Sequence, residues 1–466
     1  METKEKTVNG KDPPITPLSK HGNDQGHHPG HSLLKVFVLV TGVYCLLYLG
    51  ENRTLGGSQK LPYPGSRTVA LTQEKRGKCF PEEKNPLVHV QDSRTYLVAS
   101  YVEQRSRPSK VRTIAIVKRT EYVGYFCTFC CDDALRNSSA TYEIHSDNFG
   151  FDYGTADIMC LIPKNCSMPT HVAVYKGPLG PQKLQFLPIH NQHEQYDSFP
   201  YQFTICISVM YEYANVLQLV QTLEMFKLLG AHHVAIYQSS CNGAAQRVLD
   251  HYVQEGFVEI IPWPITKYLN ASRGWQPSVS PGDVHYFGQI AALNDCVYRF
   301  MYQTKYIVLQ DLDELIVPLR MDSWVELLPL LEQKYGVSTS FEFENNVFRN
   351  TWSGRNAAQR PKEWRGVPGV DILDHVWREP NDPNAFNNFK VIVNPRTVYS
   401  TSVHGLLSAD SSGVRVDRNV ARMYHIREPY RMDVTTEDLI TDERLWDFAP
   451  RLIPAVSDVL NKTFPK

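Results

Sequence analysis

Two aspartates separated by one residue follow a short apolar run in the second half of the chain. Asp311 and Asp313 come directly after residues 306–309, whose composition predicts a buried strand. In open α/β sheets, ligands bind outside the carboxyl ends of the strands. Carboxylates at such a place suit a hard divalent cation such as Mn²⁺ or Mg²⁺, which can bridge to a diphosphate. A solvated acidic turn would have the same composition, so the surrounding elements must decide between the two interpretations.

Strands and helices are predicted to alternate ahead of this motif. The predicted strands are 203–209, 233–238, 258–262 and 306–309, and the predicted helices are 215–229, 244–255 and 285–304. This alternation indicates a parallel sheet with right-handed crossovers, in which the strand ends share one edge. The sequence after the first strand, Ser208-Val-Met-Tyr-Glu-Tyr-Ala, contains no glycine-rich phosphate loop. A diphosphate would then be held through a metal, which favours the metal interpretation.

Composition narrows the class of protein. The chain has 466 residues, which leaves room for two or three domains, and its 48 basic and 49 acidic residues give a net charge of -1. This balance argues against nucleic acid as a partner, because no basic block is present to neutralise phosphates. Trp352, Trp364 and Trp377 could form a platform for a sugar ring, and core packing would use them equally well.

The first two hundred residues divide by composition. Residues 1–32 are rich in Pro, Gly, His and Lys and are predicted to be a disordered cytosolic tail. Residues 33–50 contain one charge, Lys35, and predict an uncleaved transmembrane anchor rather than a signal peptide. We interpret residues 51–78 as a stem and residues 79–200 as a β-rich, disulfide-containing accessory domain. Residues 201–466 would then form the catalytic domain.

Sequons and cysteines predict the orientation of the chain. All five Asn-x-Ser/Thr sequons and nine of the ten cysteines follow the apolar segment 33–50, which favours a type II protein with a luminal carboxyl-terminal part. The cysteines crowded between Cys79 and Cys166 predict a disulfide framework, because no second Cys/His pair at zinc spacing accompanies Cys127 and Cys130. Nine is an odd number, so at least one thiol is free or pairs between chains, and a homodimer is one form that the protein could take.

Several motifs occur in a fixed order from residue 203 to residue 427. They are Thr204-Ile-Cys-Ile-Ser208, then Gly288-Gln289 with Asn294-Asp295-Cys296 and Arg299, then Asp311-Leu-Asp-Glu-Leu-Ile-Val-Pro318, and finally Lys390-Val-Ile-Val-Asn-Pro395, His404 and His425-Ile-Arg427. Together they resemble glycosyltransferase family 92, a metazoan and plant family of type II Golgi membrane enzymes with a GT-A fold. The family usually has an aromatic residue where this chain has Ile426.

The resemblance implies a fold, a place in the cell and an activity. The expected fold class is α/β: a GT-A type, Rossmann-like mixed sheet with flanking helices, preceded by the β-rich accessory domain and the N-terminal transmembrane anchor. The expected location is the Golgi membrane, with a single span and a luminal catalytic domain. The expected reaction is inverting transfer of galactose from UDP-galactose, in β linkage and with Mn²⁺, to a galactose or fucose of a glycan on a glycoprotein.

The resemblance also assigns roles to individual residues. Asp313 would be a metal ligand, and Asp311 would contact the ribose or a metal-bound water. Glu314 would orient Asp313 or cap the turn. His404 would complete the metal site, since neutral imidazole suits Mn²⁺. His425 would do the same or bind the diphosphate.

The remaining candidates concern charge and proton transfer. Lys390 and Arg427 could neutralise the leaving UDP, on which negative charge develops in the transition state. Inversion requires a general base beside the acceptor hydroxyl. Four acidic residues follow the metal motif at the expected distance, and the sequence does not choose among them: Glu342, Glu344, Asp371 and Asp374.

Two other classes of protein compete with this interpretation. One is a different metal-dependent enzyme, such as a luminal phosphodiesterase or nucleotidyltransferase, which would need further ligands dispersed over several strands. The other is a non-catalytic luminal or cell-surface protein that binds glycans or mediates adhesion. Release of UDP from a nucleotide sugar would separate all three.

Overall fold

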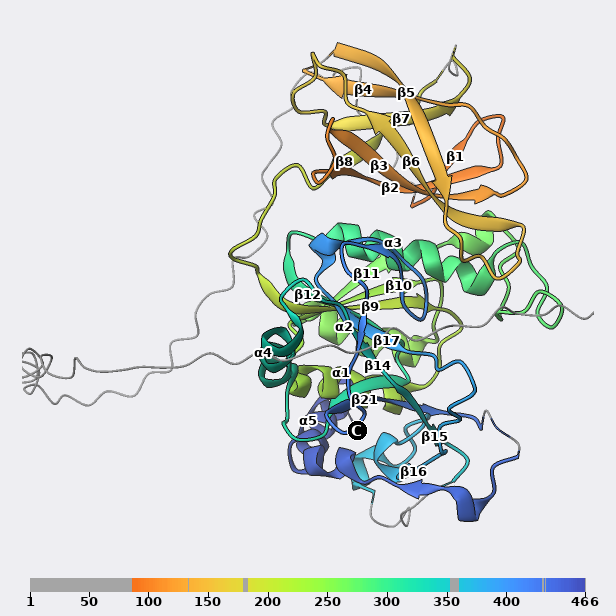
Figure 1. The fold of residues 1–466 in the computed structure, drawn as a ribbon. Helices are drawn as coiled ribbons and strands as arrows, with labels where there is room; N and C mark the ends of the chain where they lie inside the picture. Colours follow the sequence, from red (N-terminus) through yellow and green to blue (C-terminus); the bar gives the residue numbers. More distant parts are fainter. Residues whose placement is uncertain are drawn as a thin grey trace, which may run out of the picture. The chain divides into compact units, whose positions relative to one another are not determined.

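The described part of the chain is mostly β-structure. The computed structural model describes residues 86–465 apart from 133, 179–182, 353–359, 430 and 432. Within these residues it has twenty-two strands and five α-helices (Figure 1). The predicted α/β fold of GT-A, Rossmann-like type is therefore wrong for the chain. Strands and α-helices alternate regularly only between residues 201 and 309, because sheets made largely of antiparallel pairs precede and follow that segment.

The amino-terminal predictions fall outside the structure. The tail at 1–32, the anchor at 33–50 and the stem at 51–78 are not among the described residues. Across residues 86–465, with the gaps given above, no helix has both the length and the apolar character needed to cross a bilayer. This finding contradicts the prediction of a single-pass type II Golgi membrane protein.

The first sheet contains eight strands in the order β1-β2-β3-β6-β5-β4-β7-β8. Its strands are β1 (Val88–Val90), β2 (Thr95–Glu103), β3 (Lys110–Lys118), β4 (Tyr125–Cys131), β5 (Ala134–Ile144), β6 (Tyr153–Leu161), β7 (His171–Lys176) and β8 (Leu187–His190). Alternate side chains of these strands build an apolar core that includes Val111, Phe129 and Ile158. The disulfides Cys127–Cys160 and Cys131–Cys166 lie in this core, which confirms the predicted disulfide bonding of this region.

The second sheet carries the alternating segment. It includes β9 (Tyr201–Met210), α1 (Val216–Leu229), β10 (His233–Gln238), α2 (Gly243–Gln254), β11 (Val258–Pro262), α3 (Gln289–Phe300) and β12 (Thr304–Leu309). The strand order is β11-β10-β9-β12-β17-β14-β20, and β9 to β12 are parallel. Successive residues of β9 face opposite sides: Ile205 and Ile207 pack with α1 and α2, and Cys206 packs with α3.

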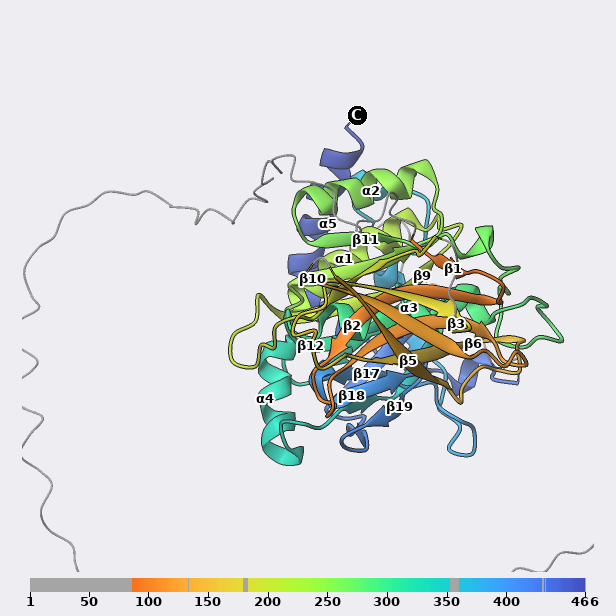
Figure 2. The same ribbon diagram turned by 90° about the horizontal axis from the view of Figure 1, so that it is seen from above.

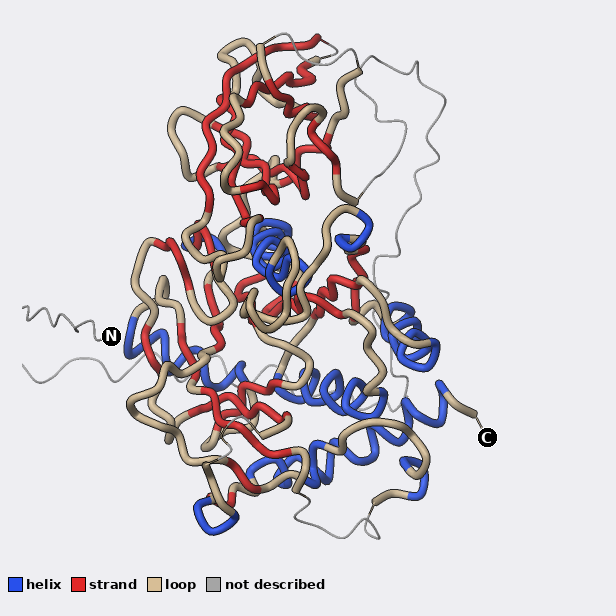
Figure 3. Tube along the Cα trace, turned by 90° about the vertical axis from the view of Figure 1, so that its right-hand side faces the viewer, coloured by secondary structure: helices blue, strands red, loops and turns tan. Residues whose placement is uncertain are grey.

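Helix α3 separates the first sheet from the second. It contacts β9 and β12 on one side and β2, β3 and β6 on the other, and Figures 1 and 3 show it as a layer between two sets of strands. Seen from above, β2, β3 and β6 cross over it (Figure 2). The contact includes a buried polar group, since the hydroxyls of Tyr101 and Tyr237 donate to the carboxylate of Asp295 at 2.6 and 2.5 Å. Arg299 Nε donates to the same carboxylate at 3.0 Å, so this buried charge is paired.

The remaining elements follow β12. They are β13 (Glu314–Pro318), α4 (Trp324–Tyr335), β14 (Phe341–Phe343), β15 (Asn345–Arg349), β16 (Trp377–Arg378), β17 (Lys390–Val393), β18 (Val398–Thr401), β19 (Leu406–Ala409), β20 (Val414–Arg415), β21 (Ala421–Arg427), β22 (Ile440–Thr441) and α5 (Ala449–Thr463). After β12 the chain leaves the second sheet. Strand β13 belongs to a third sheet, ordered β13-β21-β15-β16-β22. Residues 310–313 therefore form the passage between two sheets.

A third disulfide joins β9 to α3. Cys206 and Cys296 are bonded, and both side chains are fully buried. Cys241, by contrast, is a free, half-buried thiol. The Cys206–Cys296 bond closes a loop with a sequence separation of 90, so it strongly restricts the unfolded chain.

We predict that replacing both Cys206 and Cys296 by Ala lowers the free energy of unfolding by roughly 2–5 kcal/mol, because the loop closure is lost. Urea unfolding under non-reducing conditions measures this change. The control is Cys241→Ser, for which the change should stay within roughly 0.5 kcal/mol. Equal stability of the double variant and the control would contradict a structural role for this disulfide.

Candidate active site

Four strand ends meet at residues 310–313. β12 ends at Leu309 and β13 begins at Glu314, while Lys390 begins β17 and His425 lies near the end of β21. The pairing explains the meeting: β17 runs antiparallel to β12, with Val391 opposite Leu309, and β21 runs antiparallel to β13, with His425 opposite Glu314. Residues that are distant in the sequence are thereby brought to one turn.

Lys390 is the buried cation of this turn. Only 2% of its surface is exposed, and its Nζ lies 2.8 Å from Asp311 Oδ2 and 3.3 Å from Glu314 Oε2. Burial alone would lower the pKa of Lys390, but the two carboxylates raise it, so the amine stays charged. Because the ammonium group pairs with both Asp311 and Glu314, Lys390 stabilises the conformation of the turn.

Glu314 caps the turn by accepting a backbone hydrogen bond. Its Oε2 accepts a hydrogen bond from the backbone N–H of Asp311 at 2.9 Å, and the residue is 1% exposed. Burial raises the pKa of Glu314 to about 7, against the lowering effect of Lys390 and with Asp311 adding to the rise. Of the two roles predicted for Glu314, these contacts match the cap.

Gln289 is a partner that sequence reasoning left without a role. Its Nε2 donates to Asp311 Oδ1 at 3.3 Å and to the carbonyl oxygen of Ser208 at 2.6 Å. Gln289 begins α3 and Ser208 lies near the end of β9, so this one side chain ties two elements of the parallel region to the turn.

Asp313 and His425 form the open side of the site. Asp313 Oδ2 lies 3.3 Å from His425 Nε2, and 40% of the Asp313 side chain is exposed, against 11% for His425. Burial opposes the charged form of both groups, but the ion pair dominates: it raises the pKa of His425 and lowers the pKa of Asp313. Asp313 thus offers an ionised carboxylate to solvent beside an imidazole whose protonated form the ion pair favours.

His404 follows β18 and is a different kind of histidine. Burial, and then the charge of Lys390, lower the pKa of His404 to about 3, so its ring is neutral at physiological pH. Its Nδ1 is buried without a hydrogen-bond partner in the described residues. A neutral imidazole with an unpartnered nitrogen has the chemistry of a metal ligand.

The donors present are compatible with a divalent cation, although they do not form a closed cage. In the part of the chain that the structure describes, no group of three or more His, Cys, Asp or Glu is arranged to hold a metal. Mg²⁺-type ions often bind through one or two carboxylates and take their other ligands from water and substrate phosphates. The exposed carboxylate of Asp313 and the Nδ1 of His404, which has no described hydrogen-bond partner, are ligands suited to an ion that takes its other ligands from water and substrate.

The four candidates for the general base have other partners. Glu342 pairs with Arg415 at 3.5 Å, and Glu344 pairs with Arg418 at 2.8 Å. Asp371 and Asp374 are buried, and both pair with Arg360, at 3.0 and 2.6 Å. Asp371 also accepts a hydrogen bond from Gln221 of α1 at 2.7 Å. In the described residues, no hydrogen bond or ion pair joins any of the four to Asp311 or Asp313, so the assignment of the base stays a prediction.

Three tyrosines around the site were missed by sequence reasoning. Burial raises the pKa of Tyr286, an effect that the Arg427 charge opposes and the Asp311 charge reinforces. Tyr211 stacks on Phe287 with ring centroids 3.9 Å apart. Tyr213 has a buried hydroxyl without a described partner, and burial followed by the charge of Asp313 raises its pKa. The available signal was Tyr211-Glu-Tyr213 directly after the first parallel strand.

A loop of the first sheet supports this side of the site. Phe149 stacks on His285, with ring centroids 4.1 Å apart, and Asp147 accepts a hydrogen bond from the hydroxyl of Ser402. His285 directly precedes Tyr286, and Ser402 lies two residues before His404. Residues 285–288, which were predicted to begin the long helix, form a 3-10 turn instead, with Tyr286 and Phe287 at positive φ.

The three tryptophans considered for a sugar platform differ in how deeply they are buried. Trp364 is 1% exposed, packs in the main apolar core and donates to Ser457 Oγ at 3.0 Å. A role in a sugar platform is therefore wrong for Trp364. Trp352 and Trp377 are half-buried, so that prediction stays open for them.

We predict that Lys390→Met lowers the free energy of unfolding by roughly 3–5 kcal/mol at neutral pH, because two carboxylates lose the buried cation between them. Urea unfolding measures the change. The matched control is Lys305→Met, which removes a half-exposed pair with Glu332 at 3.6 Å and should cost no more than about 1 kcal/mol. A loss at Lys390 no larger than that at Lys305 would show that the turn does not depend on the buried charge.

A second prediction concerns pH. Burial lowers the pKa of His285 from 6.5 to about 3, so the unfolded chain binds a proton that the folded chain rejects in this window. Stability is therefore lost as the pH falls from 6.5 towards 3, by roughly 2–3 kcal/mol at pH 4.5 from this group. His285→Phe keeps the aromatic stack and should remove that part of the loss between pH 7.5 and pH 4.5. The exposed His232, replaced by Gln, serves as the control, and identical pH profiles for the wild type and His285→Phe would refute the assignment.

Comparison with known proteins places the chain in a family. The family model described as Glycosyltransferase family 92 matches residues 201–455, more than half of the chain. A Caenorhabditis elegans protein named "Glycosyltransferase family 92 protein F13G3.3" is 26% identical over 212 residues, which cover 45% of this chain and 39% of that protein. "Glycosyltransferase family 92 protein C33H5.2" from the same organism is 19% identical over 280 residues, or 57% of this chain and 50% of that protein.

A third relative has an activity in its name. "Beta-1,4-galactosyltransferase galt-1" of Caenorhabditis elegans is 26% identical over 125 residues, which cover 26% of this chain and 27% of that protein. The chain thus spans half or less of the length of the curated relatives that it matches. The family match contains β9 to β21 and every residue of the turn described above, which confirms the resemblance drawn from the motifs. The chain belongs to glycosyltransferase family 92.

Proposed function

We propose that this protein is a metal-dependent, inverting glycosyltransferase that transfers galactose from UDP-galactose, in β linkage, to a galactose or fucose of a glycan. The observation that carries the proposal is the exposed carboxylate of Asp313, which lies in the turn after parallel strand β12 and pairs with His425. Family membership supports a nucleotide sugar as donor and a glycan as acceptor. The choice of galactose rests on the name of one relative.

Asp313 and His404 are the residues that we propose would hold the cation, Mn²⁺. The ionised carboxylate of Asp313 and the neutral ring of His404 suit such an ion, while the pair with Asp313 favours the protonated form of His425, which makes His425 the poorer ligand. When bound, the cation would supply positive charge to the diphosphate. In this proposal His425 and Arg427 act on the diphosphate itself, where negative charge develops as UDP leaves.

Lys390 has an indirect role in this proposal. Its amine is used by Asp311 and Glu314, so it holds Asp311 in place rather than contacting UDP. Asp311 keeps one oxygen on Gln289, at 3.3 Å, and has its side chain one-third exposed, which leaves it able to accept a hydrogen bond from a ribose hydroxyl. The turn is thus preorganised before the donor binds, and such preorganisation lowers the reorganisation needed in the transition state.

The transfer itself exchanges one C–O bond for another and moves one proton. The bond from the anomeric carbon to the phosphate oxygen breaks, the acceptor oxygen attacks from the opposite face, and a carboxylate takes the acceptor proton. Glu342 and Glu344 lie at partly exposed positions with surface arginines as partners. Asp371 and Asp374 are held in a buried cluster by Arg360. The side chain of Glu342 is 22% exposed, more than that of Glu344, Asp374 or Asp371, so accessibility favours Glu342 as the proton acceptor.

The experiment measures UDP release from the full chain with several UDP-sugars, a galactose-terminated acceptor and Mn²⁺. We predict that Asp313→Asn lowers the rate on the order of 10²–10³-fold, because one electrostatic contact to the leaving diphosphate is lost. Asp458→Asn, an exposed aspartate of α5, is the control and should transfer at the wild-type rate. Circular dichroism verifies that both variants fold.

Two results would remove the proposal. One is near-wild-type transfer by folded Asp313→Asn, and the other is wild-type transfer that EDTA does not affect. Absence of UDP release with every donor would favour the non-catalytic, glycan-binding alternative.

A further inference from the structure

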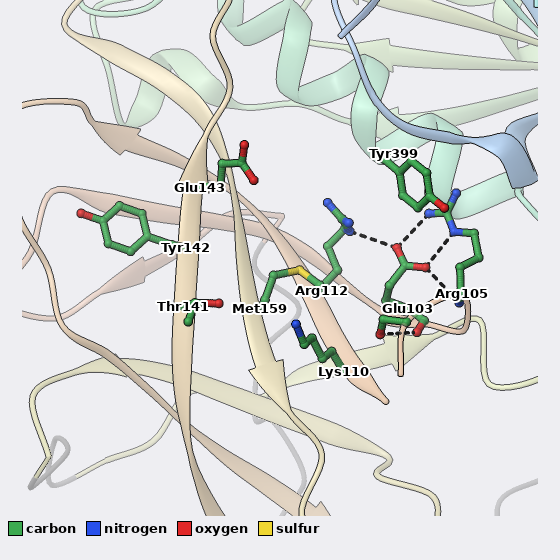
Figure 4. A pocket seen from close by; sticks show the side chains of 10 residues that line it. Glu103, Arg105, Lys110, Arg112, Thr141, Tyr142, Glu143, Met159 and Tyr399 are labelled. Atoms are coloured by element: carbon green, nitrogen blue, oxygen red, sulfur yellow. Dashed lines mark hydrogen bonds and ion pairs between the residues drawn. The ribbon is translucent and has the colours of Figure 1, made fainter. Parts of the chain in front are cut away.

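A cavity of about 380 Å³ lies on the first sheet (Figure 4). This volume is within the range of small-ligand sites, and the lining includes none of the residues proposed for catalysis. The floor is one row across three paired strands, with Arg112 of β3 opposite Met159 of β6 and Met159 opposite Thr141 of β5. Tyr399 of β18 forms a wall, so the cavity belongs to both the first sheet and the family domain.

One side of the cavity is rigid. Glu103 is 3% exposed and accepts hydrogen bonds from Arg105 Nε at 2.7 Å and from Arg112 Nε at 3.2 Å. Arg105 also donates to the carbonyl oxygen of Val398 at 2.7 Å and lies over the ring of Tyr399, 4.2 Å from its centroid. Figure 4 shows Glu103 between the two arginines, with dashed lines to both, and Tyr399 beside Arg105. The two arginines are therefore fixed in place before any ligand arrives.

Two charged groups of the cavity have no described partners. Lys110 of β3, which lies opposite Glu103 of β2, and Glu143 of β5 both line the cavity, and no hydrogen bond or ion pair joins either side chain to any residue that the structure describes. The hydroxyl of Thr141, on the same strand as Glu143, is likewise without a described hydrogen bond. Tyr142 points away from these groups and packs against Tyr125 on the opposite face (Figure 4). The cavity thus offers a separate donor and acceptor.

The charges indicate which ligand these groups fit. The lining has three cations, Arg105, Lys110 and Arg112. The number of nearby carboxylates is the same: Glu103 and Glu143 line the cavity, and Asp157 accepts a hydrogen bond from Arg112. Arg105 donates to Glu103 and to the carbonyl oxygen of Val398, and Arg112 donates to Glu103 and Asp157, so both guanidinium groups are already held by protein partners rather than aimed at a sulfate or carboxylate. A hydroxyl group both donates and accepts, so neighbouring sugar hydroxyls can satisfy a free ammonium and a free carboxylate at once.

We propose that this cavity binds a neutral sugar residue of a glycan, with Lys110 donating to one ring hydroxyl and Glu143 accepting from another. The site is distinct from the transfer site, and its occupation requires neither a nucleotide nor a metal. The loop that follows β18 carries His404, so the strand that walls the cavity also leads into the candidate active site. A glycan bound here would be held by the same strand that positions the transfer machinery.

The test is direct binding of an uncharged oligosaccharide to the full chain by calorimetry, with EDTA present and nucleotide absent. The probe is a galactose-terminated biantennary glycan without sialic acid. Lys110→Met and Glu143→Gln, which change exposed or half-buried groups, should each weaken binding about 10-fold or more, because each removes a hydrogen bond to a charged group. Lys118→Met, at the other end of β3, is the matched control and should bind as the wild type does.

Asp313→Asn separates this proposal from the proposed function. That variant should lose transfer and keep the binding of this glycan, whereas Lys110→Met should lose binding whether or not transfer occurs. Equal affinity in the wild type, Lys110→Met and Glu143→Gln, all shown to be folded, would overturn the proposal. Binding confined to the sialylated form of the glycan, or to inorganic sulfate, would overturn it equally, because the site would then recognise an anion.

Discussion

The placement of one buried ammonium between two carboxylates is the constraint on which the candidate site depends. Asp311, Asp313 and Glu314 stand within four residues, and such a cluster cannot remain ionised and half-buried without a counter-charge. Lys390 supplies it to Asp311 and Glu314, and His425 supplies it to Asp313. The turn that carries the exposed carboxylate therefore exists as a rigid unit because β17 and β21 arrive beside it.

The passage of the chain from one sheet to another explains why those strands meet. β12 ends in the parallel sheet and β13 begins in a sheet with β21, so residues 310–313 bridge two layers. Antiparallel pairing then fixes which residues lie opposite, Val391 with Leu309 and His425 with Glu314. A slip of one residue in either pairing would turn Lys390 or His425 to the other face of its sheet, and the carboxylates would lose their partners.

Helix α3 connects this turn to the first sheet. Gln289 at its start contacts Asp311, Cys296 bonds it to β9, and Asp295 receives hydrogen bonds from Tyr101 and Tyr237. Arg299 is the third donor to this carboxylate. Because a buried carboxylate is costly to separate from its donors, and Tyr101 belongs to β2, the first sheet is held to the helix by a polar contact as well as by apolar packing. The loop with Asp147 and Phe149 extends the same support to the segments that carry His404 and Tyr286.

Local patterns in the sequence determined several features. The apolar run before Asp311 was enough to predict a strand with a carboxylate pair at its end, and alternating periodicities predicted the elements from β9 to β12, since both depend on neighbouring residues. The order of the motifs indicated family 92, and the crowding of cysteines indicated disulfides between residues 127 and 166. Each of these signals lies within a short window of chain.

Only the tertiary structure decided the rest. The α/β fold class was wrong because the many short antiparallel strands outside residues 201–309 have weak local signatures, and their pairing is set by contacts between distant segments. Lys390 is 79 residues from Asp311, and His425 is 112 residues from Asp313, so no periodicity could show that each is an ion-pair partner. The same holds for Cys206–Cys296, for Tyr286 beside the acidic turn and for Trp364 in the core. The sequence by itself names the groups that can do chemistry, whereas the register of the strands determines which of them meet, because that register is the joint result of packing along the whole chain.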